Sequence, residues 1–105
     1  MGEFLAVAKV SGISRGKMKL VDLGGEEVVV ANVDGMFYAF GNLCPHFNGP
    51  LVRGKLRGFK VTCPWHRSVF DVKSGLPLKG PATSPVLTYQ VRIEGDDIRI
   101  AKRWS

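Results

Sequence analysis

The sequence predicts an all-β protein built from antiparallel sheets. Apolar and β-branched residues alternate with polar ones in runs of five to eight residues, and no long 3.6-residue pattern is present. A composition of 45% hydrophobic residues, with 13 Gly and 6 Pro, is typical of an ordered chain rich in turns. The expected strands are Leu5–Val10, Met18–Asp22, Glu27–Asn32, Met36–Phe40, Arg57–Thr62, Ser68–Val72, Thr88–Glu94 and Asp97–Lys102.

Short turn signals separate several of these strands. Asp34-Gly35 predicts a tight hairpin between its flanking runs, Ser74-Gly75 a second turn, and Gly95-Asp96 the connection between the last two strands. Consecutive strands are therefore expected to pair antiparallel.

Two stretches lack regular alternation, Gly41 to Arg57 and Leu76 to Pro85. Irregular loops held on a rigid sheet are where binding chemistry is commonly found. With 105 residues and no linker-like segment, we expect one domain over residues 1–105, with its binding part at approximately 41–85.

The sequence also indicates a location. No apolar run approaches the roughly 20 residues needed to span a bilayer, and Glu3 lies where a signal peptide would be positively charged. We expect a cytoplasmic protein that does not bind membranes. Two cysteines in such a chain favour metal-binding thiolates over a disulfide.

The chemistry is concentrated in two short motifs, Cys44-Pro45-His46 and Cys63-Pro64-Trp65-His66, which contain every Cys and His of the chain. Each close spacing lets one turn direct two ligands at one centre, and each Pro stiffens that turn. Two thiolates and two imidazoles suit zinc or iron–sulfur chemistry and suit magnesium or calcium poorly. A metal site on two loops is therefore predicted.

These motifs resemble those of the Rieske ferredoxin family. The similarity covers Cys44 to Leu51, Cys63 to Asp71 and Gly80-Pro81-Ala82, which looks like the family's proline loop over the cluster, and extends more weakly over nearly the whole chain. The resemblance implies a Rieske iron–sulfur domain, in which antiparallel sheets carry a cluster-binding subdomain made of two hairpin loops. It also implies a single [2Fe–2S] cluster as cofactor.

In that family, two cysteines bind one iron and two histidines bind the other. The resemblance assigns these roles to Cys44 and Cys63, and to His46 and His66. Histidine ligation leaves the cluster less negative, which raises its potential to roughly −150 to +300 mV, against about −400 mV for plant-type clusters.

Neighbouring positions predict where in that range the potential lies. High-potential branches carry a disulfide between the loops and a Ser and a Tyr that donate hydrogen bonds to the cluster. Here Gly49 and Trp65 match the disulfide positions, Phe70 matches the Tyr, and Ser68 is kept. A low-to-middle potential is expected, although Ser68 is as readily interpreted as an ordinary turn hydroxyl.

Other residues near the ligands have packing roles in the same interpretation. Trp65 and Phe47 lie beside ligands, where they could shield the cluster from water or simply pack. Pro81 belongs to the proline loop, and its favoured role is loop rigidity.

The net charge of +6 lies in the same part of the chain. Between Cys44 and Gly80 there are seven basic residues and one acidic residue, Asp71, whereas the remaining residues balance. A solvated basic face explains this pattern as well as a docking surface does. In the docking interpretation, acidic redox partners are steered to the exposed histidines by Lys55, Arg57, Lys60 and Arg67.

Together these features favour a monomeric electron carrier between a reductase and a terminal oxygenase, with no catalytic site of its own. The small subunit of an assimilatory nitrite reductase is an alternative with the same fold. A structural Cys2His2 zinc module is a rival of another class, although zinc fingers do not mix Cys and His within each pair. No motif supports nucleic-acid binding.

Overall fold

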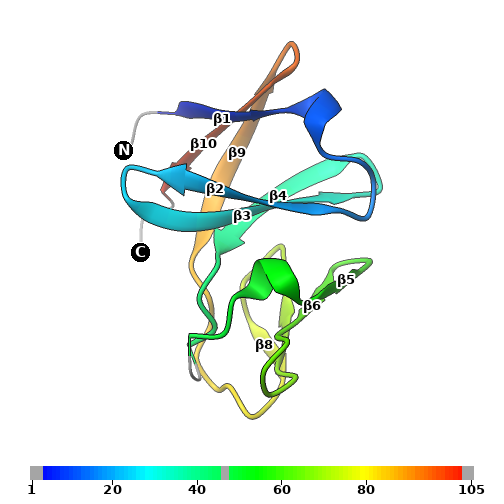
Figure 1. Cartoon of the computed structure of the whole chain (residues 1–105), viewed down its shortest axis with the longest axis vertical. Helices are drawn as coiled ribbons and strands as arrows, with labels where there is room; N and C mark the ends of the chain where they lie inside the picture. Colours follow the sequence, from blue (N-terminus) through cyan, green and yellow to red (C-terminus); the bar gives the residue numbers. More distant parts are fainter. Residues whose placement is uncertain (1–3, 46–47, 103–105) are drawn as a thin grey trace.

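Two antiparallel sheets make up the structure, a computed structural model that describes residues 4–45 and 48–102. Figure 1 shows the larger sheet above and the smaller one below. The six-stranded sheet has the order β1-β10-β9-β4-β3-β2. Its strands are β1 (Leu5–Lys9), β2 (Met18–Leu23), β3 (Glu26–Val33), β4 (Met36–Gly41), β9 (Thr88–Glu94) and β10 (Asp97–Lys102).

The four-stranded sheet lies entirely within the chain between β4 and β9 and has the order β5-β6-β7-β8. Its strands are short: β5 (Lys55–Arg57), β6 (Lys60–Thr62), β7 (Val69–Asp71) and β8 (Pro77–Lys79). Short 3-10 helices occur at η1 (Val10–Gly12) and η2 (Leu51–Arg53). No helix within the described ranges has the length and apolarity needed to cross a bilayer.

The all-β prediction is confirmed, and two hairpins follow the predicted turns closely. Asp34 (φ 54°) and Gly35 (φ 93°) both have positive φ and join β3 to β4, with Val33 paired to Met36. Positive φ at both central residues is required by the type I′ turn, whose twist matches the twist of the flanking strands. β9 and β10 have the predicted bounds and pair around Gly95.

The prediction of one strand over Arg57–Thr62 is wrong. Gly58 has a φ of 55°, so the chain reverses there and forms a hairpin in which Arg57 pairs with Lys60. The expected irregular stretch 76–85 also contains a strand, β8, whose Pro77 pairs with Phe70. Some strands that are not consecutive in the chain also pair: β1 pairs with β10, and β4 pairs with β9.

β3 is buried on both of its faces. Val28 and Val30 belong to a core within the larger sheet, together with Ile98 and Ile100. Val29 and Ala31, with the opposite orientation, belong to a second core, which the smaller sheet shares. Because both faces are buried, the sequence of this strand has consecutive apolar residues from Val28 to Ala31 and no alternation with polar ones there.

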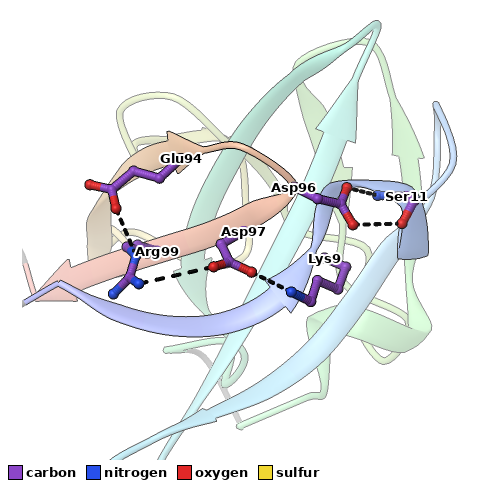
Figure 2. A network of polar contacts seen from close by, with 6 residues as sticks. All are labelled: Lys9, Ser11, Glu94, Asp96, Asp97 and Arg99. Atoms are coloured by element: carbon purple, nitrogen blue, oxygen red, sulfur yellow. Dashed lines mark hydrogen bonds and ion pairs between the residues drawn. The ribbon is translucent and has the colours of Figure 1, made fainter.

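A polar network joins β1 and η1 to the hairpin of β9 and β10 (Figure 2). Lys9 donates a hydrogen bond to Asp97, and the backbone N–H and hydroxyl of Ser11 donate to the carboxylate of Asp96 at 3.0 and 2.9 Å. Arg99 Nε lies 3.0 Å from Glu94 Oε1. The bonds of Lys9 and Ser11 attach β1 and η1 to the hairpin of β9 and β10.

The pair of Lys9 and Asp97 should make stability depend on pH. The Lys9 ammonium holds the pKa of Asp97 below its ordinary value, so the stabilisation is complete above the unfolded value of about 3.9 and is lost as pH falls through the folded pKa. Asp97→Asn should therefore lower the thermal midpoint slightly at pH 7, with the difference from wild type disappearing in acid. The exposed Asp34→Asn variant is the control; a difference that persists unchanged at pH 2 would contradict this assignment.

Candidate metal centre

The first predicted loop is a narrow turn closed at its base by backbone bonds. Leu43 and Pro50 form an isolated antiparallel bridge, and the Cys44 N–H donates to the Gly49 carbonyl at 2.9 Å. The Asn48 N–H donates to the Cys44 carbonyl at 2.6 Å, and Asn48 has a φ of 59°. Cys44 is thus fixed at the start of a closed loop.

The second loop connects β6 to β7 and repeats this arrangement. The Cys63 N–H donates to the Ser68 carbonyl at 2.8 Å, and the Arg67 N–H donates to the Cys63 carbonyl at 3.1 Å. Arg67 has a φ of 62°, as Asn48 does in the first loop. Both cysteines therefore occupy the same position in matching loops, a similarity of backbone that the spacing alone did not reveal.

The loops separate the predicted ligands by depth. Cys44 and Cys63 are 1% and 2% exposed and are not joined by a disulfide. Both belong to the core shared by the two sheets, whereas His66 is exposed. His46 and Phe47 lie outside the described residues. Within the described residues, no three Cys, His, Asp or Glu side chains are grouped closely enough to hold a metal ion.

The two loops touch each other at Gly49. A Cβ placed on Gly49 would lie 2.6 Å from Cys63 Sγ and 3.3 Å from the indole of Trp65, so only glycine fits. Gly49 and Trp65 are the positions that match the disulfide of the high-potential branches, and they are neighbours here as well. The Trp65 ring covers Gly49 but is itself 57% exposed.

Ser68 connects the second loop to the proline loop. Its hydroxyl oxygen accepts the Ala82 N–H at 2.9 Å, and both residues are buried. Pro81, which follows a cis peptide bond from Gly80, is exposed. Because Ser68 Oγ is the acceptor in this bond, its own hydrogen is available for donation to another group. Ser68 thus has a structural role whether or not it also donates to a cluster sulfur.

Phe70 is fully buried beside the cysteines. Its ring belongs to the same core as both thiols, and in the sheet it pairs with Val61. Phe70 occupies the position of a hydroxyl donor in high-potential relatives. Here its side chain has no hydroxyl and only packs in the core.

Asn42 is a supporting residue that the sequence analysis missed. Its side chain is 2% exposed, donates to Glu27 Oε1 at 2.8 Å and accepts the Val52 N–H at 2.9 Å. The backbone carbonyl of Asn42 also accepts a hydrogen bond from the Leu51 N–H at 2.7 Å. Asn42 therefore fastens the segment before Cys44 to both β3 and η2. An Asn directly after a strand is a common turn former, and that was the available signal.

The predicted docking residues are only partly brought together. One hollow beside the second loop is lined by Cys63 and Pro64 and by four basic residues, Arg53, Lys55, Arg57 and Arg67. We call this the basic hollow. Arg53 was not predicted, and Lys60, although exposed, is not among its lining residues.

The two buried cysteines and the exposed His66 are residue types that suit an iron–sulfur cofactor. Two buried thiols become costly anions when they are deprotonated, so a cationic centre is needed to stabilise them as thiolates. The matching loops hold these thiols in the core, and His66, three residues after Cys63 in the second loop, is at the surface.

Comparison with known proteins agrees with this geometry. The family model for the Rieske [2Fe-2S] domain matches residues 3–90. The ferredoxin component of the naphthalene 1,2-dioxygenase system of Pseudomonas aeruginosa is 38% identical over 88 residues, which cover 84% of this chain and 85% of that protein. Human apoptosis-inducing factor 3 is 35% identical over 95 residues, 90% of this chain, but the chain spans only 16% of its length.

Solved structures show the same fold. The ferredoxin of carbazole 1,9a-dioxygenase from Nocardioides aromaticivorans IC177 superposes with a TM-score of 0.91 at 31% identity, covering 95% of this chain and 98% of that one. The chain belongs to the Rieske [2Fe–2S] domain family, and its cofactor is one Rieske-type [2Fe–2S] cluster. The zinc alternative is therefore set aside.

Gly49→Ala should disrupt the site. Its new Cβ would overlap Cys63 Sγ at 2.6 Å, which forces the loops apart at a cost of about 1–3 kcal/mol and lowers iron content. Gly41→Ala is the matched control, because its Cβ would meet Leu87 at an ordinary 3.9 Å. Iron analysis and urea unfolding give both readouts. Full iron content and unchanged stability in Gly49→Ala would show that the loops do not meet in this way.

Ser68→Ala should lower both stability and reduction potential. The buried Ala82 N–H loses its acceptor, at a cost of about 1–3 kcal/mol, and the hydroxyl available to the cluster is removed. Urea unfolding and voltammetry measure the two effects, with the exposed Ser74→Ala as control. A stability loss with no change in potential would limit Ser68 to holding the proline loop.

Proposed function

We propose that this chain is an electron carrier whose cluster is held by Cys44, His46, Cys63 and His66. The two cysteines would bind one iron, and the two histidines the other. The observation that carries the proposal is the pair of matching loops, each with a buried cysteine at the same backbone position. We also propose that residues 1–105 act as a single Rieske domain whose cluster-binding part spans approximately 41–85.

When bound, a [2Fe–2S] cluster of this type gains and loses a single electron. The protein's own residues decide how that electron is exchanged. Exposed His66 lies at the surface where a partner can approach, while Cys44 and Cys63 are shielded by the core. The absence of a disulfide and of a hydroxyl at Phe70 favours a low-to-middle potential.

The proposed acceptor is a terminal oxygenase and the proposed donor a reductase. Relatives that match over most of both their own length and this chain include ferredoxin components of dioxygenase systems, and carbazole 1,9a-dioxygenase provides a solved complex of oxygenase and ferredoxin. The carrier would supply electrons to the oxygenase and would not bind the oxygenase's substrate. Its proposed location is the cytoplasm. The solved putative nitrite reductase small subunit, at 20% identity, shares the fold, and no contact in the described part of the structure favours that role.

The basic hollow gives a partner with acidic residues a place to dock. Arg53, Lys55, Arg57 and Arg67 line this hollow beside the second loop, and a positive cleft raises the encounter rate with acidic surfaces. Lys60 would add to this field from β6 without lining the hollow.

Iron analysis and EPR of the reduced protein test the proposal. Wild-type protein should hold two irons and give the signal of a His-ligated cluster, Cys63→Ser should lose most of its iron, and the exposed Ser84→Ala should retain it. His66→Cys should lower the potential of any cluster that it retains, because a thiolate adds negative charge. Full iron and an unaltered spectrum in Cys63→Ser would refute the assigned ligands.

A further inference from the structure

A second hollow lies beside the first loop and differs in character from the basic hollow. Three segments that are distant in sequence form it: the start of β3, the first loop, and the residues that lead into β9. We call it the acidic groove. The residues on which the argument depends are four apolar ones, Leu43, Pro45, Pro85 and Leu87, and two acidic ones, Glu26 and Glu27.

The four apolar residues named above are exposed, whereas Val86, which also lines the acidic groove, is buried. Leu43 and Leu87 each expose 50% of their surface, and both prolines are exposed as well. The groove is also firmly built, since the Gly41 N–H donates to the Leu87 carbonyl at 2.9 Å. A cluster of exposed apolar side chains on a fixed backbone is typical of a surface that another molecule covers.

The two carboxylates are held in place by donors from the protein. Asn42 donates to Glu27 at 2.8 Å, and the Tyr89 hydroxyl donates to Glu26 at 3.2 Å. Burial first, and the Glu26 charge second, raise the pKa of Tyr89 to about 12, so this hydroxyl keeps its proton at neutral pH. Each carboxylate can accept further bonds from a partner, because an ionised carboxylate has about four acceptor sites.

Each loop therefore has its own neighbouring hollow, and the two are opposite in charge. The charged residues that line the basic hollow are all positive, and those that line the acidic groove are both negative, on a chain whose net charge is +6. Pro45 follows Cys44 and Pro64 follows Cys63, so both hollows reach the ligand loops directly.

We propose that the acidic groove is a second docking site, which takes a redox-partner segment that presents an aliphatic side chain next to a Lys or Arg. The inference rests on the proposed electron-carrier function. A partner held at the basic hollow alone can rotate about that contact. A second contact of opposite charge beside the other loop fixes its orientation and disfavours partners that lack the cation.

Two cobalt complexes probe the two hollows without a protein partner. Tris(phenanthroline)cobalt(III) is an apolar trication suited to the acidic groove, and tris(oxalato)cobaltate(III) is a trianion suited to the basic hollow. Each takes one electron from the reduced protein and becomes cobalt(II), while the cluster is oxidised by one electron. Stopped-flow rates are measured at low ionic strength, where charge effects are largest.

The variants Glu27→Gln and Leu87→Ser each remove one property of the groove. Glu27→Gln keeps an acceptor for Asn42 and loses the charge, and Leu87→Ser shortens an exposed apolar side chain. The rate with the trication should fall about threefold or more in Glu27→Gln, as expected for one charge opposite three, and less in Leu87→Ser. The trianion rate should not fall in either, and Arg67→Gln should show the reverse preference. Leu20→Ser, at an exposed leucine on β2, is the control.

The outcomes separate this inference from the proposed function. A trication rate that is unchanged in both groove variants, or that falls equally with the trianion rate, would overturn the acidic groove as a docking site. If wild-type protein holds no iron or reduces neither complex, the electron-carrier function itself fails.

Discussion

The double burial of β3 is the constraint on which the rest of the structure depends. One face of this strand completes the core of the larger sheet through Val28 and Val30, and the other supports the core that contains both cysteines. Val29, Ala31 and Val33 of this strand belong to the core that contains the cysteines, together with Phe40 of β4. Because a strand alternates its side chains, a shift of one residue in its pairing would exchange the two faces and misplace both cores. The hairpin turn at Asp34-Gly35 fixes that pairing.

The site is built outward from this shared core by backbone bonds rather than by long side chains. Matching hydrogen bonds close the loops around Cys44 and Cys63, and Gly49 lets the loops approach each other without an intervening side chain. Asn42 and Ser68 then fasten the loops to η2 and to the proline loop. Cys44 and Cys63 are buried while His66 is exposed. If these residues bind the cluster as proposed, the core would protect one side of the cluster and a partner could approach the other.

Local chemistry made most of the fold and the positions of the two Cys loops predictable from the sequence. Alternation and turn residues located most of the strands, and the Cys and His motifs located the loops, since both signals lie within a few neighbouring residues. The prediction failed at Gly58, where one glycine within an apparent strand reversed the chain. The bond of Ser68 to Ala82 and the assembly of the acidic groove could not be predicted, because they join segments that only the tertiary fold brings together.

Hydrogen–deuterium exchange of the cluster-loaded protein, followed by mass spectrometry, tests the shared core most directly. If β3 supports both sheets, then peptides covering 28–33 and 60–72 should open in one cooperative unit, with opening free energies that agree within about 1 kcal/mol. If residues 60–72 exchange as rapidly as an exposed turn while 28–33 stays protected, the smaller sheet is an independent attachment, and β3 does not hold the two sheets together.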